Sequence, residues 1–155
     1  MTIYFLRHAE AEDHAASDFD RKLTPKGLQQ AEKVGKFCAA HGLVPVAILS
    51  SPVTRARQTA ELVASALGME VALADWLACG METSTLLERL APHAGSDSVL
   101  VVGHEPDFST AIGDLCGSTE PGAIVVTKAS LTAVDAPWLE PGAGQLQFSI
   151  PCRLM

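Results

Sequence analysis

Two kinds of hydrophobic pattern alternate along the chain. Short apolar runs rich in β-branched or aromatic residues predict strands at residues 2–6, 46–49 and 98–102, more weakly near Val71, and two or three more at 123–126, 130–134 and 145–150. Between these runs, apolar residues recur three or four positions apart, which is typical of helices with one buried face. Strands that alternate with amphipathic helices favour a mostly parallel sheet covered by helices on both faces.

Capping residues indicate where the longer helices begin and end. A polar N-cap followed by proline occurs twice, at Thr24-Pro25 and at Ser51-Pro52. Gly42 and Gly68 are expected to end these two helices. Their buried faces are expected to carry Leu28, Ala31, Val34 and Cys38 in the first and Leu62, Val63, Ala66 and Leu67 in the second.

Shorter elements complete the expected fold. One helix is expected around residues 85–90, and another from residues 103–106 to about Cys116-Gly117, whereas residues 136–144 resemble a surface loop. We therefore expect an α/β fold, three-layer α/β/α with a mostly parallel central sheet, in a single domain spanning residues 1–155.

Composition and charge narrow the class of protein. The net charge of −7 argues against binding nucleic acid or anionic membranes. No apolar run approaches the ~20 residues of a membrane span, and no signal peptide is evident. The four cysteines are scattered and form no C-x-x-C pair, which is typical of buried thiols in a reducing compartment. We expect a cytoplasmic protein.

Side chains suited to phosphate chemistry follow three of the predicted strands. Arg7 and His8 come directly after the first strand, Arg55 lies in the helix after the second, and His104 follows the third. Because the carboxyl ends of parallel strands share one edge of the sheet, we expect these residues to meet there. Guanidinium groups and helix N-termini bind phosphate oxygens, and a neutral imidazole is a nucleophile. The pattern predicts phosphoryl transfer through a phosphohistidine, without a metal or other cofactor.

Two other interpretations stay open on the residues alone. The segment HAEAEDH, at residues 8–14, together with His104-Glu105 contains normal metal ligands, although Arg7 beside His8 would repel a cation. The same positive cluster could also bind phosphate without turnover, as a catalytically silent module. Taken singly, each residue also fits an ordinary surface or capping role.

Several motifs resemble the histidine phosphatase superfamily, also called phosphoglycerate mutase-like. They are LRHAEAE at residues 6–12, SSPVTRARQTAE at 50–61 and VVGHEPDFS at 101–109. The closer similarity is to the SixA-type phosphohistidine phosphatases, whose D-x-x-R-x-L-T-x-x-G segment is matched by Asp18, Arg21, Leu23, Thr24 and Gly27. The PCRL sequence at residues 151–154 is also similar.

The resemblance implies a role for each matching residue. His8 would accept the phosphoryl group, Arg7, Arg55 and His104 would bind and neutralise it, and Arg21 would lie at the rim of the site. Two positions depart from the family pattern: Ala9 stands where Gly is frequent, and Lys22 where Pro is common.

The leaving group distinguishes the possible substrates. An alkyl phosphate needs a general acid, whereas phosphohistidine can leave as a neutral imidazole. Glu105, directly after His104, is the best acid candidate, although it could merely begin the following helix, and Glu82 is the second. The stretch between Arg55 and His104 is too short for the long insertion of a mutase, which predicts an open site. We expect a phosphorylated protein (phosphohistidine) as substrate, with a small phosphate ester as the alternative.

Overall fold

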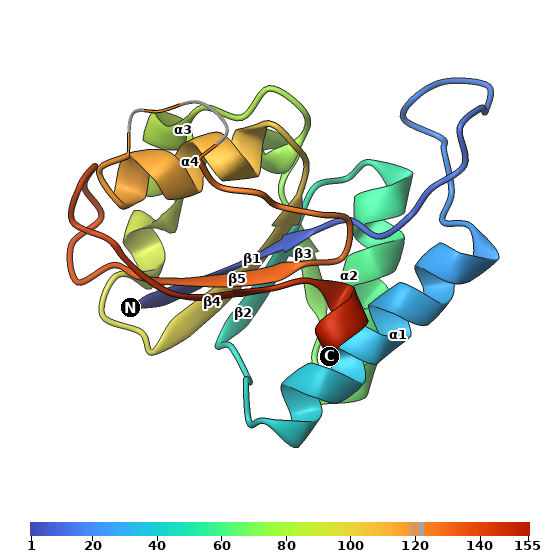
Figure 1. The fold of residues 1–155 in the computed structure, drawn as a ribbon, viewed down its shortest axis with the longest axis horizontal. Coiled ribbons are helices and arrows are strands. Elements are labelled where there is room, and N and C mark those ends of the chain that lie inside the picture. Colours follow the sequence, from blue (N-terminus) through green and yellow to red (C-terminus); the bar gives the residue numbers. More distant parts are fainter. Residues whose placement is uncertain (119, 121–122) are drawn as a thin grey trace.

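The computed structural model describes residues 1–118, 120 and 123–155, and its centre is a six-stranded sheet (Figure 1). The strands are β1 (Thr2–Arg7), β2 (Ala47–Ser50), β3 (Val71–Leu73), β4 (Ser98–Gly103), β5 (Leu131–Asp135) and β6 (Gln145–Ile150). Their order is β3-β2-β4-β1-β5-β6. The first four in this order run parallel, whereas β5 is antiparallel to both of its neighbours.

Helices cover both faces of this sheet, as expected for a three-layer α/β/α fold. The helices are α1 (Pro25–Ala40), α2 (Thr54–Leu67), α3 (Thr83–Leu90) and α4 (Asp107–Leu115), and short turns η1 (Asp75–Leu77), η2 (Ala91–His93) and η3 (Cys152–Leu154) link or end them. Helices α1 and α2 lie on one face and α3 and α4 on the other (Figure 1). Alternate residues of β1 point to opposite layers, so Ile3 and Phe5 pack with α4 while Leu6 packs with α1 and α2.

The start of α1 follows the capping signal, and its buried face differs from the expected one. The hydroxyl of Thr24 accepts the Gly27 N–H at 3.0 Å, and Pro25 occupies the first turn. Gly27 approaches the segment after β1 so closely that a Cβ there would overlap the carbonyl oxygen of Glu10. Leu28 is 39% exposed, contrary to the prediction, because the buried face is centred on Gly27, Ala31 and Val34.

Helix α2 begins two residues later than its capping signal predicted, at Thr54 instead of Pro52. The hydroxyl of Ser51 accepts the Val53 N–H in the turn before the helix. Val63 is buried as expected, but Ala66 is exposed because the neighbouring Ala64 takes the inward position.

Two further expectations are wrong. Residues 123–126 do not form a strand, because β5 already pairs with β1 from Thr2 to Leu6. Cys79 is exposed, although Cys38 and Cys152 are buried as predicted. In the part of the chain that the structure describes, no helix is long and apolar enough to cross a membrane.

Candidate active site

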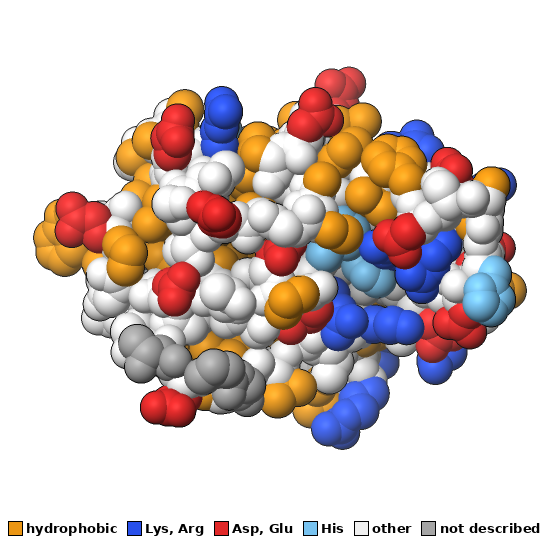
Figure 2. Space-filling model, turned by 90° about the horizontal axis from the view of Figure 1, so that it is seen from above, with side chains coloured by type: hydrophobic (Ala, Val, Ile, Leu, Met, Phe, Trp, Pro, Cys, Tyr) orange, Lys and Arg blue, Asp and Glu red, His pale blue; other side chains and the backbone are white. Residues whose placement is uncertain are grey.

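The carboxyl ends of β1, β4 and β2 lie side by side and bring the predicted residues together. Arg7 at the end of β1 is in register with Gly103 at the end of β4. The His8 N–H donates to the Gly103 carbonyl at 3.0 Å, and the Ser51 N–H donates to Val102 at 2.9 Å. As a result, the ring centroids of His8 and His104 are 5.3 Å apart. Figure 2 shows histidine side chains in a hollow of the surface, with Lys and Arg side chains beside them.

The hydrogen bonds of His8 determine which ring nitrogen carries the proton. Its Nδ1 lies 2.8 Å from the carbonyl oxygen of Ala9, which can only accept, so Nδ1 is protonated. Its Nε2 is 3.3 Å from Nε of Arg55, which donates to it. Burial, opposed by the bond to Ala9, lowers the pKa of His8 to about 3, and the nearby His104, Arg55 and Arg7 lower it further. The ring is therefore neutral at pH 7, with a lone pair on Nε2.

The second histidine is held by the opposite nitrogen. Nε2 of His104 lies 2.8 Å from the hydroxyl of Ser51, which already accepts the Val53 N–H. When Ser51 donates its own proton to Nε2, the ring proton of His104 stands on Nδ1. This Nδ1 is buried and has no hydrogen-bond partner among the described residues. Burial, with a contribution from Arg55, lowers the pKa of His104 to about 4.

Arg7 combines one fixed contact with one buried donor left unpaired. Its Nη1 donates to the carbonyl of Val126 at 2.8 Å. Its Nε is buried and has no partner within the described chain. Burial lowers the pKa of Arg7, and the negative charge of Glu105 opposes that shift. Arg7 Nε is thus a buried donor in the same cluster as His8, and His104 Nδ1 is a second one when Ser51 donates to Nε2; such donors suit the oxygens of an anion.

Arg55 is held by the segment between β1 and α1. Its Nη1 donates to the carbonyl of Asp18 at 2.8 Å, and its Nη2 pairs with the Asp18 carboxylate at 3.1 Å. Asp18 also pairs with Arg21 at 2.8 Å, and this bond with Arg21 is the main reason that the pKa of Asp18 is lowered. Arg21 is therefore linked to Arg55 only through Asp18, and its place at the rim of a substrate site stays a prediction.

Thr59 connects the turn after β1 to helix α2. Its hydroxyl accepts the Ala9 N–H at 3.1 Å and donates to the Arg55 carbonyl at 2.7 Å. Ala9 is fully buried, so its methyl group belongs to the core that packs against α1 and α2. These bonds fix the spacing between His8 and Arg55.

The two carboxylates considered as acids lie in different places. Glu105 Oε1 accepts the Ser109 N–H at 2.9 Å, so its carboxylate caps the first turn of α4. It nevertheless lies close enough to Arg7 to influence the pKa of that side chain. Glu82 is exposed and lines a separate hollow with Cys79, whose Sγ is 3.7 Å from Arg55.

The carboxylates of the alternative metal site point to other partners. Glu10 is ion-paired with Lys26 at 2.8 Å, and Glu12 accepts the Lys22 N–H at 3.2 Å. Across residues 1–118, 120 and 123–155, no three His, Cys, Asp or Glu side chains gather closely enough to hold a metal ion.

Sequence reasoning missed the contacts that position the site. Ser51 was interpreted only as a helix cap, yet it holds His104. Asp18 was noted only as part of a motif, yet it binds the guanidinium of Arg55. One sequence signal could have pointed to both contacts: Ser51 is in the same motif as Arg55, and Asp18 is in the same motif as Arg21.

Comparison with known proteins agrees with this geometry. The histidine phosphatase superfamily (branch 1) model matches residues 3–78. Phosphohistidine phosphatase SixA of Escherichia coli (strain K12) is 28% identical, over 99% of this chain and 96% of its own length. An uncharacterised protein of Picosynechococcus is 42% identical over 70% of this chain and 68% of its own. The solved structure of the protein histidine phosphatase SixA with tungstate has a TM-score of 0.87 and 26% identity, with 100% of both chains covered.

An α/β/α fold that gathers two histidines and two arginines at one edge of its sheet suits phosphoryl transfer, and the relatives identify the class as a phosphatase. The chain belongs to the histidine phosphatase superfamily, whose phosphatases are metal-independent.

Proposed function

We propose that this phosphatase removes the phosphoryl group from phosphohistidine on a protein, through a covalent intermediate on His8. The observation that carries the proposal is the hydrogen bond from His8 Nδ1 to the Ala9 carbonyl. It leaves Nε2 unprotonated on a ring that burial keeps neutral, which is the state in which imidazole is a nucleophile.

The first step transfers the phosphoryl group to His8. Nε2 of His8 forms a bond to phosphorus while the bond from phosphorus to the substrate imidazole breaks. The departing imidazole leaves neutral because its other nitrogen carries a proton. Arg7 Nε and the Nδ1 proton of His104 face the negative charge that spreads over the phosphoryl oxygens. The Nε–H of Arg55, which donates to His8 before the reaction, then donates to the same phosphoryl oxygens.

The second step restores the enzyme. A water molecule attacks phosphorus on the side opposite His8 and the bond to Nε2 breaks. The proton of the water passes to a phosphoryl oxygen or to solvent, and inorganic phosphate leaves. His8 returns to the neutral form with its proton on Nδ1, where the Ala9 carbonyl has held it throughout.

Three observations support this proposal. SixA, named as a phosphohistidine phosphatase, aligns with nearly the whole of this chain. Tungstate, a tetrahedral oxyanion like phosphate, is bound in a structure of that similar protein. In addition, the Glu105 carboxylate is engaged with the start of α4, and phosphohistidine has the smaller need for a general acid.

A small-molecule phosphomonoesterase is the second candidate, and the position of Glu105 favours it. Glu105 directly follows His104 and lies near Arg7, so a protonated Glu105 could reach a departing oxygen. We expect the protein to release phosphate faster from a phosphohistidine peptide than from a phosphoserine peptide. Preference for the phosphoserine peptide would overturn the proposed function.

Replacing Glu105 by Gln separates the two candidates further. We expect a small and uniform loss of kcat/KM for alkyl phosphate, aryl phosphate and phosphohistidine, because the carboxylate caps a helix. Losses graded in that order, reaching about 10² for the alkyl phosphate, would assign general acid catalysis to Glu105. A uniform large loss would mean that Glu105 orients His104 or water. Glu82→Gln is the matched variant, and a graded loss there would place the acid at Glu82.

We also propose the cytoplasm as the location. The four cysteines are free, and Cys79 exposes its thiol, which supports a reducing compartment. Cell fractionation that finds the protein outside the cytoplasm would contradict this location.

A further inference from the structure

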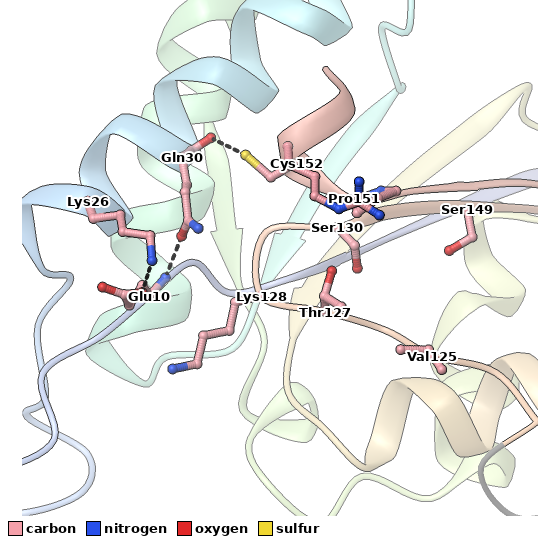
Figure 3. Close-up of a pocket in the computed structure, with 11 residues that line it drawn as sticks. Glu10, Lys26, Gln30, Val125, Thr127, Lys128, Ser130, Ser149, Pro151 and Cys152 are labelled. Carbon is pink, nitrogen blue, oxygen red and sulfur yellow. Dashed lines mark hydrogen bonds and ion pairs between the residues drawn. The ribbon is translucent and has the colours of Figure 1, made fainter.

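A second hollow lies next to the candidate active site and has a basic lining. It has a volume of about 550 Å³ and lies between the start of α1, the segment at residues 125–130 and the chain that follows β6 (Figure 3). We call it the basic groove, and the lining residues used below are Lys26, Gln30, Thr127, Lys128, Ser130 and Arg153.

The segment at residues 125–130 forms the boundary between the basic groove and the active site. On one side, the Val126 carbonyl accepts Arg7 Nη1, and the Ala129 N–H donates to the carbonyls of Arg7 and His8 at 3.1 and 3.2 Å. On the other side, Thr127 and Lys128 line the groove. A polypeptide that placed its phosphohistidine against His8 could therefore continue across this segment into the groove.

The charge of the groove is opposite to that of the whole molecule. Lys26, Lys128 and Arg153 line it, against the single carboxylate of Glu10 among its described lining residues. Glu10 is already paired with Lys26 at 2.8 Å, whereas Lys128 and Arg153 are exposed. On a chain with a net charge of −7, this local excess of positive charge selects acidic ligands.

A buried hydroxyl in the groove also suits a polar ligand. Ser130 is only 1% exposed, and its Oγ has no hydrogen-bond partner within the described part of the chain. The hydroxyl of Thr127 points into the same space as that of Ser130 (Figure 3). Buried hydroxyl groups are normally paired, so Ser130 is suited to a hydrogen bond with an occupant of the groove.

The far wall of the groove is fixed to α1. Cys152 Sγ donates to the Gln30 carbonyl at 3.7 Å, and Lys33 donates to the Arg153 carbonyl at 3.5 Å. The side chain of Gln30 in turn accepts the Glu10 N–H at 2.9 Å. The PCRL sequence at residues 151–154 thus contributes Arg153 to a preformed wall.

We propose that the basic groove binds an acidic segment of the phosphorylated protein substrate, next to the phosphohistidine. This proposal rests on the proposed function and identifies how the enzyme recognises its partner. Lys128 and Arg153 pair with carboxylates of that segment, and Ser130 donates to one of its oxygens. The groove does not contact the reacting atoms, so it affects KM for an extended substrate and leaves the phosphoryl-transfer step to the residues around His8.

Two synthetic phosphohistidine peptides test the proposal, one flanked by Asp and Glu and one flanked by Asn and Gln. We expect the wild type to have a KM roughly tenfold lower for the acidic peptide at low salt, and the difference to shrink as salt is raised. Lys128→Glu and Arg153→Glu should each reduce this preference, and the double variant should abolish it. Both side chains are exposed, so neither change endangers the fold.

Lys36→Glu is the matched control, because it makes the same charge change at an exposed position of α1 outside the groove. Lys36→Glu should keep the preference for the acidic peptide. If it lost this preference as fully as Lys128→Glu and Arg153→Glu do, the preference would depend on overall charge alone, and the proposal would be overturned. Ser130→Ala should reduce the preference without any charge change. A wild type that hydrolyses both peptides equally well would overturn the groove proposal, whereas a wild type that hydrolyses neither would overturn the proposed function.

Discussion

The surroundings of His8 and His104 are alike in position and opposite in hydrogen bonding. Both histidines follow neighbouring parallel strands, both are buried, and burial lowers the pKa of each well below the ordinary value. However, His8 is held through Nδ1 by a backbone carbonyl, whereas His104 is held through Nε2 by the hydroxyl of Ser51. His8 is therefore left with a lone pair on Nε2. His104 is left with a buried Nδ1 that has no hydrogen-bond partner among the described residues.

This difference indicates that the partner of a histidine determines its chemical role more than its place in the fold does. A neutral ring with its lone pair beside Arg55 can form a bond to phosphorus. A ring whose proton stands on Nδ1 can donate to a phosphoryl oxygen but cannot attack from that atom. We therefore expect the two histidines to fail in different ways when they are replaced.

The largest effect should come from removing His8. His8→Ala should lower kcat by a factor on the order of 10⁴ or more, because the proposed nucleophile is lost. His104→Ala should cost less, about 10² to 10³, which is usual for one donor that stabilises the transition state. An acid-labile, base-stable phosphoenzyme should be trapped from the wild type and be missing in His8→Ala. A folded His8→Ala protein more active than His104→Ala would reverse the assignment.

The next effect compares two arginines on the same helix. Arg55→Lys keeps the charge but loses the planar fork that meets His8 and Asp18, so we expect kcat/KM to fall by about 10². Arg7→Lys should behave similarly. Arg57→Lys is the matched control, since the side chain of Arg57 is partly exposed and pairs only weakly with Glu61 at 3.5 Å. Near wild-type activity in both Arg7→Lys and Arg55→Lys would show that charge alone suffices.

The sequence predicted the parts of the site that depend on strand ends, and missed those that depend on distant contacts. The alternation of strands and helices was enough to bring His8, Arg55 and His104 to one edge of the sheet. The bond between Ser51 and His104 joins positions 53 residues apart, and no local pattern reveals such a contact. The same limit explains the strand wrongly predicted at residues 123–126. The apolar run there is local, and it cannot reveal that β5 already pairs with β1.

A smaller effect should come from the hydroxyl that holds His104. Ser51→Ala removes the partner of Nε2, so the ring can exchange its tautomer and we expect kcat to fall roughly tenfold. Ser50→Ala is the matched control, because Ser50 is equally buried but donates to the Ser51 carbonyl. Both variants should lose about 1 kcal/mol of stability, whereas only Ser51→Ala should lose activity. Equal kcat in the two variants would mean that Ser51 does not position His104.

The last effect concerns the pH dependence of stability and does not involve catalysis. The pKa of His8 is about 3 and that of His104 about 4 in the folded protein, against about 6.5 in an unfolded chain. Between pH 6.5 and 4 the unfolded chain therefore binds more protons, so the free energy of unfolding should fall as the pH decreases through this range. The slope should reach at most about 1.4 kcal/mol per pH unit for each histidine.

The histidine contribution can be isolated by urea unfolding at pH 7, 6 and 5. His8→Asn should be less sensitive to acid than the wild type, because one group that takes up a proton on unfolding has been removed. His14→Asn is the matched control, and since His14 is exposed it should retain the wild-type slope. If His8→Asn kept that slope as well, His8 would already bind its proton in the folded state. Its Nε2 would then carry no lone pair near neutral pH, and the distinction between the two histidines would fail.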